Sequence, residues 1–437
     1  MLEKLQQHIA NKFSFLENKK LLIAISGGVD SVVLTQLFHQ LKFAISLAHC
    51  NFNLRGEESD IDEVFVKGLG NKLQLKTFTV SFQTEDYASK NKVSTQVAAR
   101  ELRYDWFETL INEHAFDYVL TAHHADDNLE TFLINLSRGT GLEGLTGIPE
   151  INKTIVRPLL IFSREEIEQY ATLNKIDWRE DKSNESTKYL RNKIRHQIVP
   201  ILKEINPNLL DSFQHTIDNL QGSQDIINDT IEAFKKKTLQ NSENGIVKIE
   251  VSEIKKVVNH KAYLHQLLKE YGFTEWNDIV TLLDAQSGKQ VFSKTHRLLK
   301  DRTFLLLSEI NQIHQNFDCL IDESTSEITV PIHLLFDKTT DLNIENQQVI
   351  VVDLDKIIFP LTLRKWKEGD FFYPKGMQGK KKVSKFFKDE KCSLLEKENT
   401  WLLCNKNGII WIVGKRQDSR FCADSSTNKM LKIQFSS

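Results

Sequence analysis

The chain has 437 residues, of which 40% are hydrophobic and 27% charged, and its formal net charge is −2. This length is enough for two or three domains with sizeable cores. The near-neutral charge excludes an overall basic surface, so any nucleic-acid-binding surface has to be a local patch. No stretch is apolar enough to predict a membrane span, and five dispersed cysteines without a Cys-x-x-Cys pair predict reduced thiols in a cytoplasmic protein.

About the first 180 residues alternate between strand-like and helix-like patterns. Residues 21–25, LLIAI, are apolar at every position, which is typical of a buried parallel strand, and residues 32–41 continue with helical spacing. Further strands are expected at residues 43–52, 76–82, 117–124 and 154–160, and helices at residues 59–73, 95–114, 127–138 and 163–175. Ser163 and Glu166 have the spacing of a capping box at the start of the last helix. This alternation predicts an α/β fold with a Rossmann-like, mostly parallel sheet covered on both faces.

The segment SGGVDS, which joins the first strand to the first helix, is the most specific motif. Its glycines allow close approach of the backbone to a ligand, its serines offer hydroxyl groups, and the helix start offers free N–H groups. We therefore expect a phosphate cradle made by Ser26, Gly27, Gly28, Val29, Asp30 and Ser31. The segment lacks the GxxxxGK(S/T) and GxGxxG patterns of other phosphate-binding loops. A tight turn with Asp30 or Ser31 as helix cap is the alternative, and Asp30 is expected to lie at a solvated turn.

Polar residues also follow the second and fourth strands, where ligands of parallel sheets bind. His49 could bind a nucleotide or only hydrogen-bond a loop. The cluster after the fourth strand consists of His123, His124, Asp126, Asp127 and Glu130. Carboxylates are common at helix starts, and a zinc site is disfavoured because HEXXH spacing and cysteine ligands are missing. Beside a phosphate cradle these carboxylates suit Mg²⁺ or a cationic substrate, and Asp127 and Glu130 can share one helix face.

Two later segments have weaker signals. Residues 139–149, GTGLEGLTGIP, predict a mobile loop that approaches a ligand closely, with an ordinary connector as the alternative. A turn is expected at Asp181, Ser183 and Asn184. The helix after it has a basic face made by Arg191, Lys193, Arg195 and His196, for which a solvated surface is the alternative.

The pattern changes after Pro200. Residues 206–327 are expected to be mainly helical, with a hairpin at residues 291–307 and a polar linker at residues 311–327. Short strand-like runs return from Ile328. The expected domains are therefore residues 1–205, 206–327 and 328–437, the last being small and strand-containing.

The last domain contains a lysine-rich stretch with interleaved aromatic residues. Lys380, Lys381 and Lys382 lie close in sequence to Trp366, Phe372 and Tyr373. Lysines can neutralise phosphates while exposed aromatic rings stack on bases, so the stretch predicts a nucleic-acid-binding patch. The alternative is a basic surface loop whose aromatic residues form a small core.

Taken in order, these motifs resemble those of the tRNA(Ile)-lysidine synthetases, a family of the PP-loop ATP pyrophosphatase superfamily. The resemblance rests on SGGVDS, HCNFNLR, QVAARELRY, TAHHADDNLET, SRGTGLEGLTG, RPLL and SNESTKYLRNKIRH. It is dense over residues 20–200 and returns in RKWKEGDFFYPKGMQGKKKVSKFFKDEKC and IIWIVGKRQDSRF. The middle of the chain shows little similarity.

The resemblance implies a specific reaction. ATP adenylates the wobble cytidine of an isoleucine tRNA with a CAU anticodon at C2, and the ε-amino group of free L-lysine then displaces AMP. The product, lysidine, pairs with adenosine, so that decoding changes from AUG to AUA and aminoacylation changes from methionine to isoleucine. Two alternatives stay open: a tRNA thiolase of the same superfamily, against which the isolated Cys50 counts, and a non-catalytic tRNA-binding protein.

The resemblance also implies roles for individual residues. The loop Ser26 to Ser31 and His49 would bind ATP, and Asp30 would position Mg²⁺. Asp127 and Glu130 would receive the lysine ammonium and help to free its amine. The expected tRNA contacts are Arg100, Arg103, Arg191, Arg195, Lys380, Lys381 and Lys382. A homodimer is compatible with the resemblance.

Overall fold

The structure, a computed structural model, describes residues 1–180, 190–241, 245–310, 318–342 and 347–436. It contains two compact units, Met1–Asp229 (unit 1) and Thr230–Ser437 (unit 2). The boundary between them lies inside a long helix, α11, whereas the sequence places one after residue 205; the three expected domain ranges stay a prediction. Within the described residues, no helix combines the length and apolarity needed to cross a membrane.

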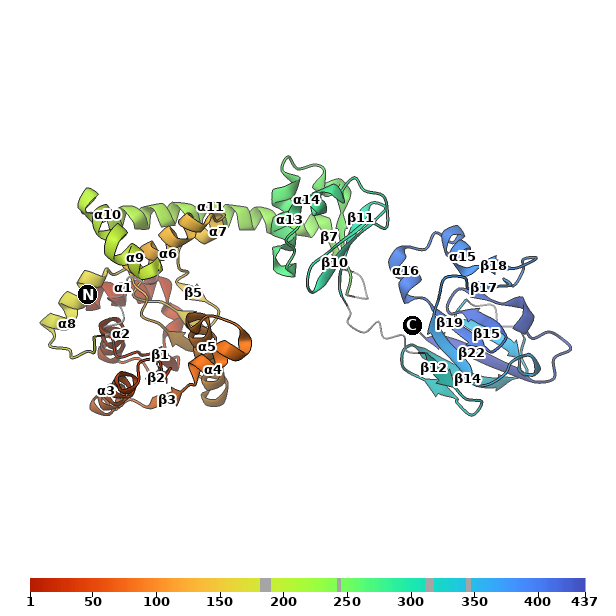
Figure 1. The fold of residues 1–437 in the computed structure, drawn as a ribbon, viewed down its shortest axis with the longest axis horizontal. Helices are drawn as coiled ribbons and strands as arrows, with labels where there is room; N and C mark the ends of the chain where they lie inside the picture. The colour runs from red at the N-terminus through yellow and green to blue at the C-terminus, as the bar shows by residue number, and fades with distance from the viewer. Residues whose placement is uncertain (181–189, 242–244, 311–317, 343–346, 437) are drawn as a thin grey trace. The chain divides into compact units, whose positions relative to one another are not determined.

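Unit 1 is built around one sheet (Figure 1). Its elements are α1 (Leu2–Lys12), β1 (Leu21–Ala24), α2 (Val29–Gln40), β2 (Ile45–Asn51), α3 (Glu57–Leu73), β3 (Thr77–Ser81), α4 (Thr84–Asn91), α5 (Thr95–His114), β4 (Tyr118–Leu120), α6 (Ala125–Arg138), α7 (Leu142–Leu145), β5 (Ile151–Asn152), β6 (Ile155–Val156), α8 (Arg164–Leu173), α9 (Leu190–Lys193), a π-helical turn (Ile194–Ile198), α10 (Val199–Ile205) and α11 (Leu209–Thr238).

The sheet has the strand order β3-β2-β1-β4-β6-β5, in which only the β5–β6 pair is antiparallel among the described strands. The predicted mostly parallel sheet is therefore confirmed. Alternation along β1 sends Leu21 and Ile23 into a core with α1, α2, α3 and α8, and Leu22 into a core with α5 on the opposite face. Because β1, β2 and β4 run in parallel, the polar residues that follow them meet at one edge of the sheet.

Local signals set several of the helix boundaries. The predicted capping box is present, since Ser163 Oγ accepts a hydrogen bond from Glu166 N at 3.1 Å and Glu166 Oε2 accepts one from Ser163 N at 2.7 Å. The glycine-rich segment after α6 contains α7 and is anchored at its end, because Asn128 Oδ1 accepts a hydrogen bond from Ile148 N at 2.6 Å. Asp181, Ser183 and Asn184, where a turn was expected, lie outside the described residues.

The described part of unit 2 combines three larger sheets and one two-stranded sheet with short helices. Its elements after α11 are β7 (Leu239–Asn241), β8 (Val247–Glu250), α12 (Val251–Ile254), α13 (His260–Leu268), α14 (Trp276–Thr281), β9 (Gln290–Phe292), β10 (His296–Asp301), β11 (Phe304–Glu309), β12 (Cys319–Ile321), β13 (Glu327–Ile328), β14 (His333–Thr339), β15 (Val349–Asp353), β16 (Leu361–Lys365), β17 (Phe371–Phe372), β18 (Lys381–Lys382), α15 (Val383–Asp389), α16 (Leu394–Asn399), β19 (Trp401–Asn405), β20 (Gly408–Ile412), β21 (Arg416–Gln417) and β22 (Met430–Ser436).

The expected hairpin at residues 291–307 is confirmed as β10 and β11, but it belongs to a five-stranded sheet, β7-β8-β11-β10-β9. The strands that join it have three or four residues, too few for a clear alternation in sequence. The expected linker at residues 311–327 is partly wrong. Cys319–Ile321 forms β12, which pairs with β16, and Ile321 is buried in the core between the sheets β12-β16-β19-β20-β21 and β13-β14-β22-β15.

Candidate functional site

The SGGVDS segment forms a compact loop between β1 and α2. Ser31 Oγ accepts a hydrogen bond from Ser26 N at 3.2 Å and donates one to Gly28 O at 2.9 Å, while Ser26 Oγ accepts from Gly28 N at 3.3 Å. Gly27 has φ +96°, a conformation that strains any residue with a side chain. Gly28 caps α2, so the first N–H groups of the helix point out beyond the loop, as a phosphate cradle requires.

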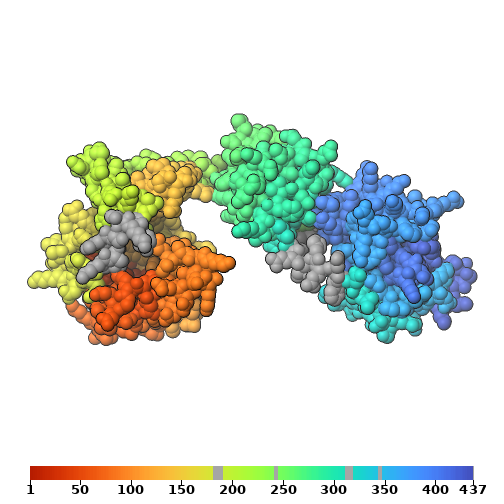
Figure 2. Space-filling view, viewed as in Figure 1, coloured from red at the N-terminus to blue at the C-terminus, as the bar shows by residue number. Residues whose placement is uncertain are grey.

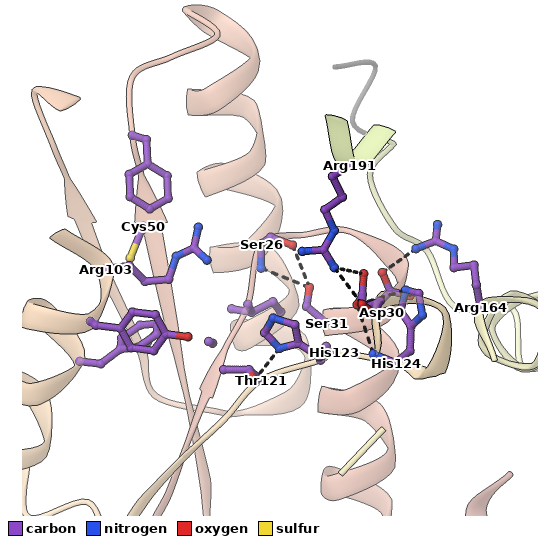
Figure 3. Close-up of a pocket in the computed structure, with 18 of the residues that line it drawn as sticks. Ser26, Asp30, Ser31, Cys50, Arg103, Thr121, His123, His124, Arg164 and Arg191 are labelled. Atoms are coloured by element: carbon purple, nitrogen blue, oxygen red, sulfur yellow. Dashed lines mark hydrogen bonds and ion pairs between the residues drawn. The ribbon is translucent and has the colours of Figure 1, made fainter. Parts of the chain in front are cut away.

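This loop opens into a cavity of about 450 Å³ (Figure 3). Its described lining comes from the ends of the first strands, from α5, from the start of α6 and from four later residues, Arg164, Arg191, Asn192 and Arg195. In the space-filling view, residues near 50–110 and residues near 190–205 lie on the same face of unit 1 (Figure 2). The described lining includes four guanidinium groups, of Arg103, Arg164, Arg191 and Arg195, against two carboxylates, of Asp30 and Asp127. The excess of positive charge favours a polyanion such as a triphosphate.

Asp30 lies in the wall of the cavity, so the expectation that it lies at a solvated turn is wrong. Its side chain is only 24% exposed, and its Oδ2 accepts a hydrogen bond from Arg164 Nη1 at 2.5 Å. The other oxygen, Oδ1, is buried without a hydrogen-bond partner among the described residues, and His124 Nε2 is 3.9 Å from it. Burial raises the pKa of Asp30, although His124 and Arg164 oppose the shift. A buried carboxylate oxygen with an unused lone pair suits a hard cation such as Mg²⁺.

At the same edge of the sheet, the carboxylates of Asp127 and Glu130 form ion pairs with Arg191 and Arg195. Arg191 donates from Nε to Glu130 Oε2 at 2.8 Å and from Nη2 to Asp127 Oδ1 at 3.0 Å. Arg195, which lies in the π-helical turn, donates from Nε to Glu130 Oε1 at 2.6 Å and from Nη2 to Asp127 Oδ1 at 3.1 Å. The carboxylates assigned to lysine and the arginines assigned to tRNA therefore form one network, and the π-helical turn that contains Arg195 is a helical irregularity of a kind frequent at functional sites.

The two carboxylates differ in their access to the cavity. Asp127 lines it, whereas Glu130 is 1% exposed and lies behind the guanidinium groups. Burial acts to raise the pKa of Asp127, but the positive charges of His124 and Arg191 outweigh it, so the pKa is lowered and Asp127 is ionised at neutral pH. Asp127 is thus the carboxylate that a cationic ligand in the cavity can reach.

The neighbouring residues His123, His124 and Asp126 differ in charge and in contacts. Burial lowers the pKa of His123 to about 4, so its imidazole is neutral, and its Nδ1 is 3.0 Å from Thr121 Oγ1. Burial also acts to lower the pKa of His124, but Asp126, Asp127 and Asp30 outweigh it and raise the pKa. Asp126 connects helices, since it accepts hydrogen bonds from Arg164 N at 2.8 Å and Lys203 Nζ at 2.5 Å.

Two predicted residues lie differently from expectation. His49 lies outside the cavity lining: it is buried, with its Nδ1 2.9 Å from Ile25 O, beneath the phosphate loop. Arg100 also lies outside the lining and packs over Tyr104, whereas Arg103 lines the cavity and lies over the ring of Phe52, 5.2 Å from its centroid. Figure 3 shows Arg103 on one side of the phosphate-loop serines and the Asp30–Arg164 pair on the other.

The three predicted lysines of unit 2 are not equivalent. Lys381 Nζ is 2.8 Å from Asp389 Oδ2, and its side chain is mostly buried. Lys380 and Lys382 are exposed, and Lys380 Nζ lies 5.2 Å from the centroid of the Phe371 ring. Within this trio, Lys380 and Lys382 present charge that no carboxylate of the described residues neutralises, whereas Lys381 does not.

Sequence reasoning missed Arg164, Phe52 and Tyr104 as cavity residues. Arg164 looks like an ordinary first-turn residue after a helix cap, and Phe52 and Tyr104 look like core aromatics. The only available signal was the position of Phe52 just past the end of a parallel strand. In the described part of the chain, no group of three or more His, Cys, Asp or Glu side chains is arranged as a metal site.

The phosphate loop, the mostly parallel sheet and the cavity are those of a nucleotide-binding α/β protein, and comparison with protein families agrees with this class. A PP-loop domain matches residues 1–202, so unit 1 contains an ATP-using PP-loop domain. A TilS substrate binding domain matches residues 242–310, and a TilS substrate C-terminal domain matches residues 361–434.

Full-length relatives identify the family. The chain is 39% identical to the tRNA(Ile)-lysidine synthase of Parabacteroides distasonis over 441 residues, which covers 100% of both chains. It is 38% identical to that of Bacteroides thetaiotaomicron, covering 98% of each chain, and 30% identical to one from Clostridium perfringens, covering 100% of this chain and 99% of the other. The chain belongs to the tRNA(Ile)-lysidine synthase family.

A solved tRNA thiolase from Methanococcus maripaludis is a distant neighbour. It covers 50% of this chain and 78% of its own, with 18% identity and a TM-score of 0.42. A likeness at this level has no bearing on activity.

Proposed function

We propose that this chain joins free L-lysine to C2 of the wobble cytidine of an isoleucine tRNA with a CAU anticodon, converting ATP to AMP and pyrophosphate. The observation that supports it most directly is the phosphate loop opening into a cavity whose wall contains Asp30, Asp127 and four guanidinium groups. The same space offers a site for a polyanion and a carboxylate for a cation. The cytoplasmic location stays a prediction, and a homodimer stays compatible with the resemblance.

In the first step the tRNA base becomes adenylated and pyrophosphate leaves. The hydroxyl group of Ser26 and the N–H groups at the start of α2 bind the phosphates, Ser31 holds the loop in shape through Gly28 O, and the surrounding guanidinium groups offset the phosphate charge. Asp30 would hold Mg²⁺ through its unpartnered oxygen. When bound, Mg²⁺ supplies positive charge that stabilises the departing pyrophosphate.

In the second step the lysine ammonium first gives up a proton to solvent, the free ε-amino group then forms the new C–N bond at C2, and the C2–O bond to AMP breaks so that AMP leaves. Asp127 is ionised and lines the cavity, so it pairs with the lysine ammonium and holds it near the base. The neutral imidazole of His123 adds a hydrogen-bonding group without adding charge. Glu130 is buried and does not reach the cavity; its role is to orient Arg191 and Arg195.

The tRNA contacts we propose lie in both units. Arg103, Arg191 and Arg195 line the cavity where the wobble base has to enter, and the exposed Arg100 lies one helical turn from Arg103 on α5. In unit 2 we assign phosphate contacts to Lys380 and Lys382. A tRNA thiolase would need a reactive cysteine here, but burial raises the pKa of Cys50 to about 12, so the thiol stays protonated.

Incorporation of labelled lysine into a CAU-anticodon isoleucine tRNA transcript tests the proposal. The wild-type chain should incorporate lysine with one pyrophosphate released per lysine. Asp30→Ala should reduce both by at least about 100-fold, because electrostatic stabilisation of a departing group is a large catalytic term. Asp86→Ala, which removes an exposed carboxylate on α4, is the matched control. Wild-type protein without lysine incorporation refutes the function, and an Asp30→Ala variant with wild-type pyrophosphate release refutes the site.

A further inference from the structure

The hairpin β17–β18 in unit 2 places aromatic and basic side chains on one face. In its antiparallel register Phe371 is opposite Lys382, and Phe372 is opposite Lys381. Successive residues of a strand point to opposite sides. Phe372 is fully buried and Lys381 contacts Asp389 and the ring of Phe386, so this pair faces inward. Phe371, which is 45% exposed, and Lys382 therefore face outward together.

Both of these outward-facing side chains line a cavity of about 540 Å³, which we name the hairpin pocket. Phe371 and the exposed Met377 form its apolar part, and four lysines, Lys380, Lys381, Lys382 and Lys385, form its basic part. The acid among its described lining residues is Asp389, which Lys381 already neutralises. Three cationic groups thus lie beside an exposed ring and a thioether, a combination that neither a core nor an ordinary solvated surface requires.

The loop of the hairpin is anchored to the rest of unit 2. The buried carboxylate of Asp418 accepts a hydrogen bond from Tyr373 N at 2.9 Å, and Tyr373 O accepts one from Ser419 N at 2.7 Å. Lys375 N donates to Gln417 O at 2.9 Å. The pocket is therefore preformed, which reduces the ordering cost of binding.

We propose that the hairpin pocket binds one unpaired nucleotide of the tRNA, with its base against Phe371 and Met377 and its phosphates near Lys380, Lys382 and Lys385. This inference rests on the proposed function, since it takes the nucleic acid to be the tRNA substrate. A base-paired stem would explain the lysines but not the aromatic ring, because its bases are already stacked and its phosphates need no apolar hollow. An unpaired base has a free face for stacking, and the pocket volume lies in the range of small-ligand sites.

The test is tRNA affinity of the full-length chain at several salt concentrations. Phe371→Ala should weaken binding about tenfold with an unchanged salt slope, because stacking is not electrostatic. Phe371→Tyr keeps the ring and should bind as the wild type does. Lys382→Ala should lower the salt slope by about 0.7 to 0.9, the change expected for one phosphate contact. Leu320→Ala removes an exposed apolar side chain on β12, and Lys338→Ala an exposed lysine on β14; both positions lie outside the matched TilS domains, so both variants should leave affinity and slope unchanged.

Each outcome decides between the inference and the proposed function. If wild-type protein incorporates lysine but Phe371→Ala binds tRNA normally, the nucleotide pocket is refuted and the function stands. If Lys382→Ala lowers the slope while Phe371→Ala has no effect, the surface binds a stem backbone instead, and the inference is again wrong. If wild-type protein binds tRNA without incorporating lysine, the function is refuted, and the Phe371 variants still report on the pocket.

Discussion

Glu130→Gln tests whether the buried carboxylate stabilises unit 1 through its two arginines. The side chain is 1% exposed and accepts hydrogen bonds from Arg191 Nε at 2.8 Å and from Arg195 Nε and Nη2 at 2.6 and 3.1 Å. The glutamine keeps the shape of the side chain, but it removes the charge and turns one acceptor into a donor that faces a guanidinium N–H.

The expected loss of stability follows from the burial of Glu130 and from the partial exposure of its two arginine partners. Breaking a fully buried ion pair costs about 3–5 kcal/mol, and a single hydrogen bond to a charged group contributes about 1.5–3 kcal/mol. Arg191 and Arg195 are 41% and 32% exposed and keep Asp127 as a second partner, so water and Asp127 offset part of the loss. We expect a loss of about 2 kcal/mol, which for a unit of this size corresponds to a fall of roughly 4–8 °C in its melting temperature.

Scanning calorimetry of the full-length chain measures this shift. Glu108→Gln, at an exposed position on α5, is the matched control and should shift the transition by less than about 1 °C. A double-mutant cycle with Arg195→Gln should give a coupling energy of at least about 1 kcal/mol. The assignment of Glu130 as a positioning residue is wrong if Glu130→Gln has the same melting temperature as the control variant. It is also wrong if the losses of unfolding free energy caused by the two substitutions are additive.

Two further predictions concern the cavity wall. Asp127→Asn should raise the KM for lysine by at least about tenfold and the KM for ATP by less than about threefold, because Asp127 faces the cation site; equal changes in steady-state kinetics would instead indicate a nucleotide or metal role. Cys50→Ala should retain at least about half of the wild-type lysine incorporation, because a thiol with a pKa of about 12 is protonated at neutral pH; a loss beyond about 100-fold would favour the thiolase alternative.

The sheet and the phosphate loop could be predicted because their signals are local. A run of apolar residues, a glycine-rich turn and an amphipathic helix occupy about twenty consecutive positions, and parallel strands then bring their carboxyl ends to one edge. The same reasoning placed Asp127 and Glu130 on one helix face, and the structure agrees. Each of these expectations needed only chain order and strand direction.

The partners of the site residues could not be predicted because they are distant in sequence. Arg164 pairs with Asp30 across 134 residues, and Arg191 with Glu130 across 61. A charged helix face that looks solvated in the sequence is instead half-buried against α6, and only the packing of α9 and the π-helical turn on that helix reveals it. The burial of Asp30 could not be predicted for the same reason, because its partner Arg164 is distant in sequence and the residues around Asp30 alone indicate a solvated turn.

Lys380, Lys381 and Lys382 show how strand register can change a functional prediction. As consecutive residues they look equivalent, and three phosphate contacts would follow from their charge alone. The pairing of Phe372 with Lys381 turns the middle lysine inward to Asp389, and its neighbours are left outside. Replacing all three with alanine should therefore reduce the salt slope of tRNA binding by about two phosphate contacts rather than three, and removing the Lys381–Asp389 pair as a whole, by Lys381→Ala with Asp389→Ala, should reduce stability without changing the slope.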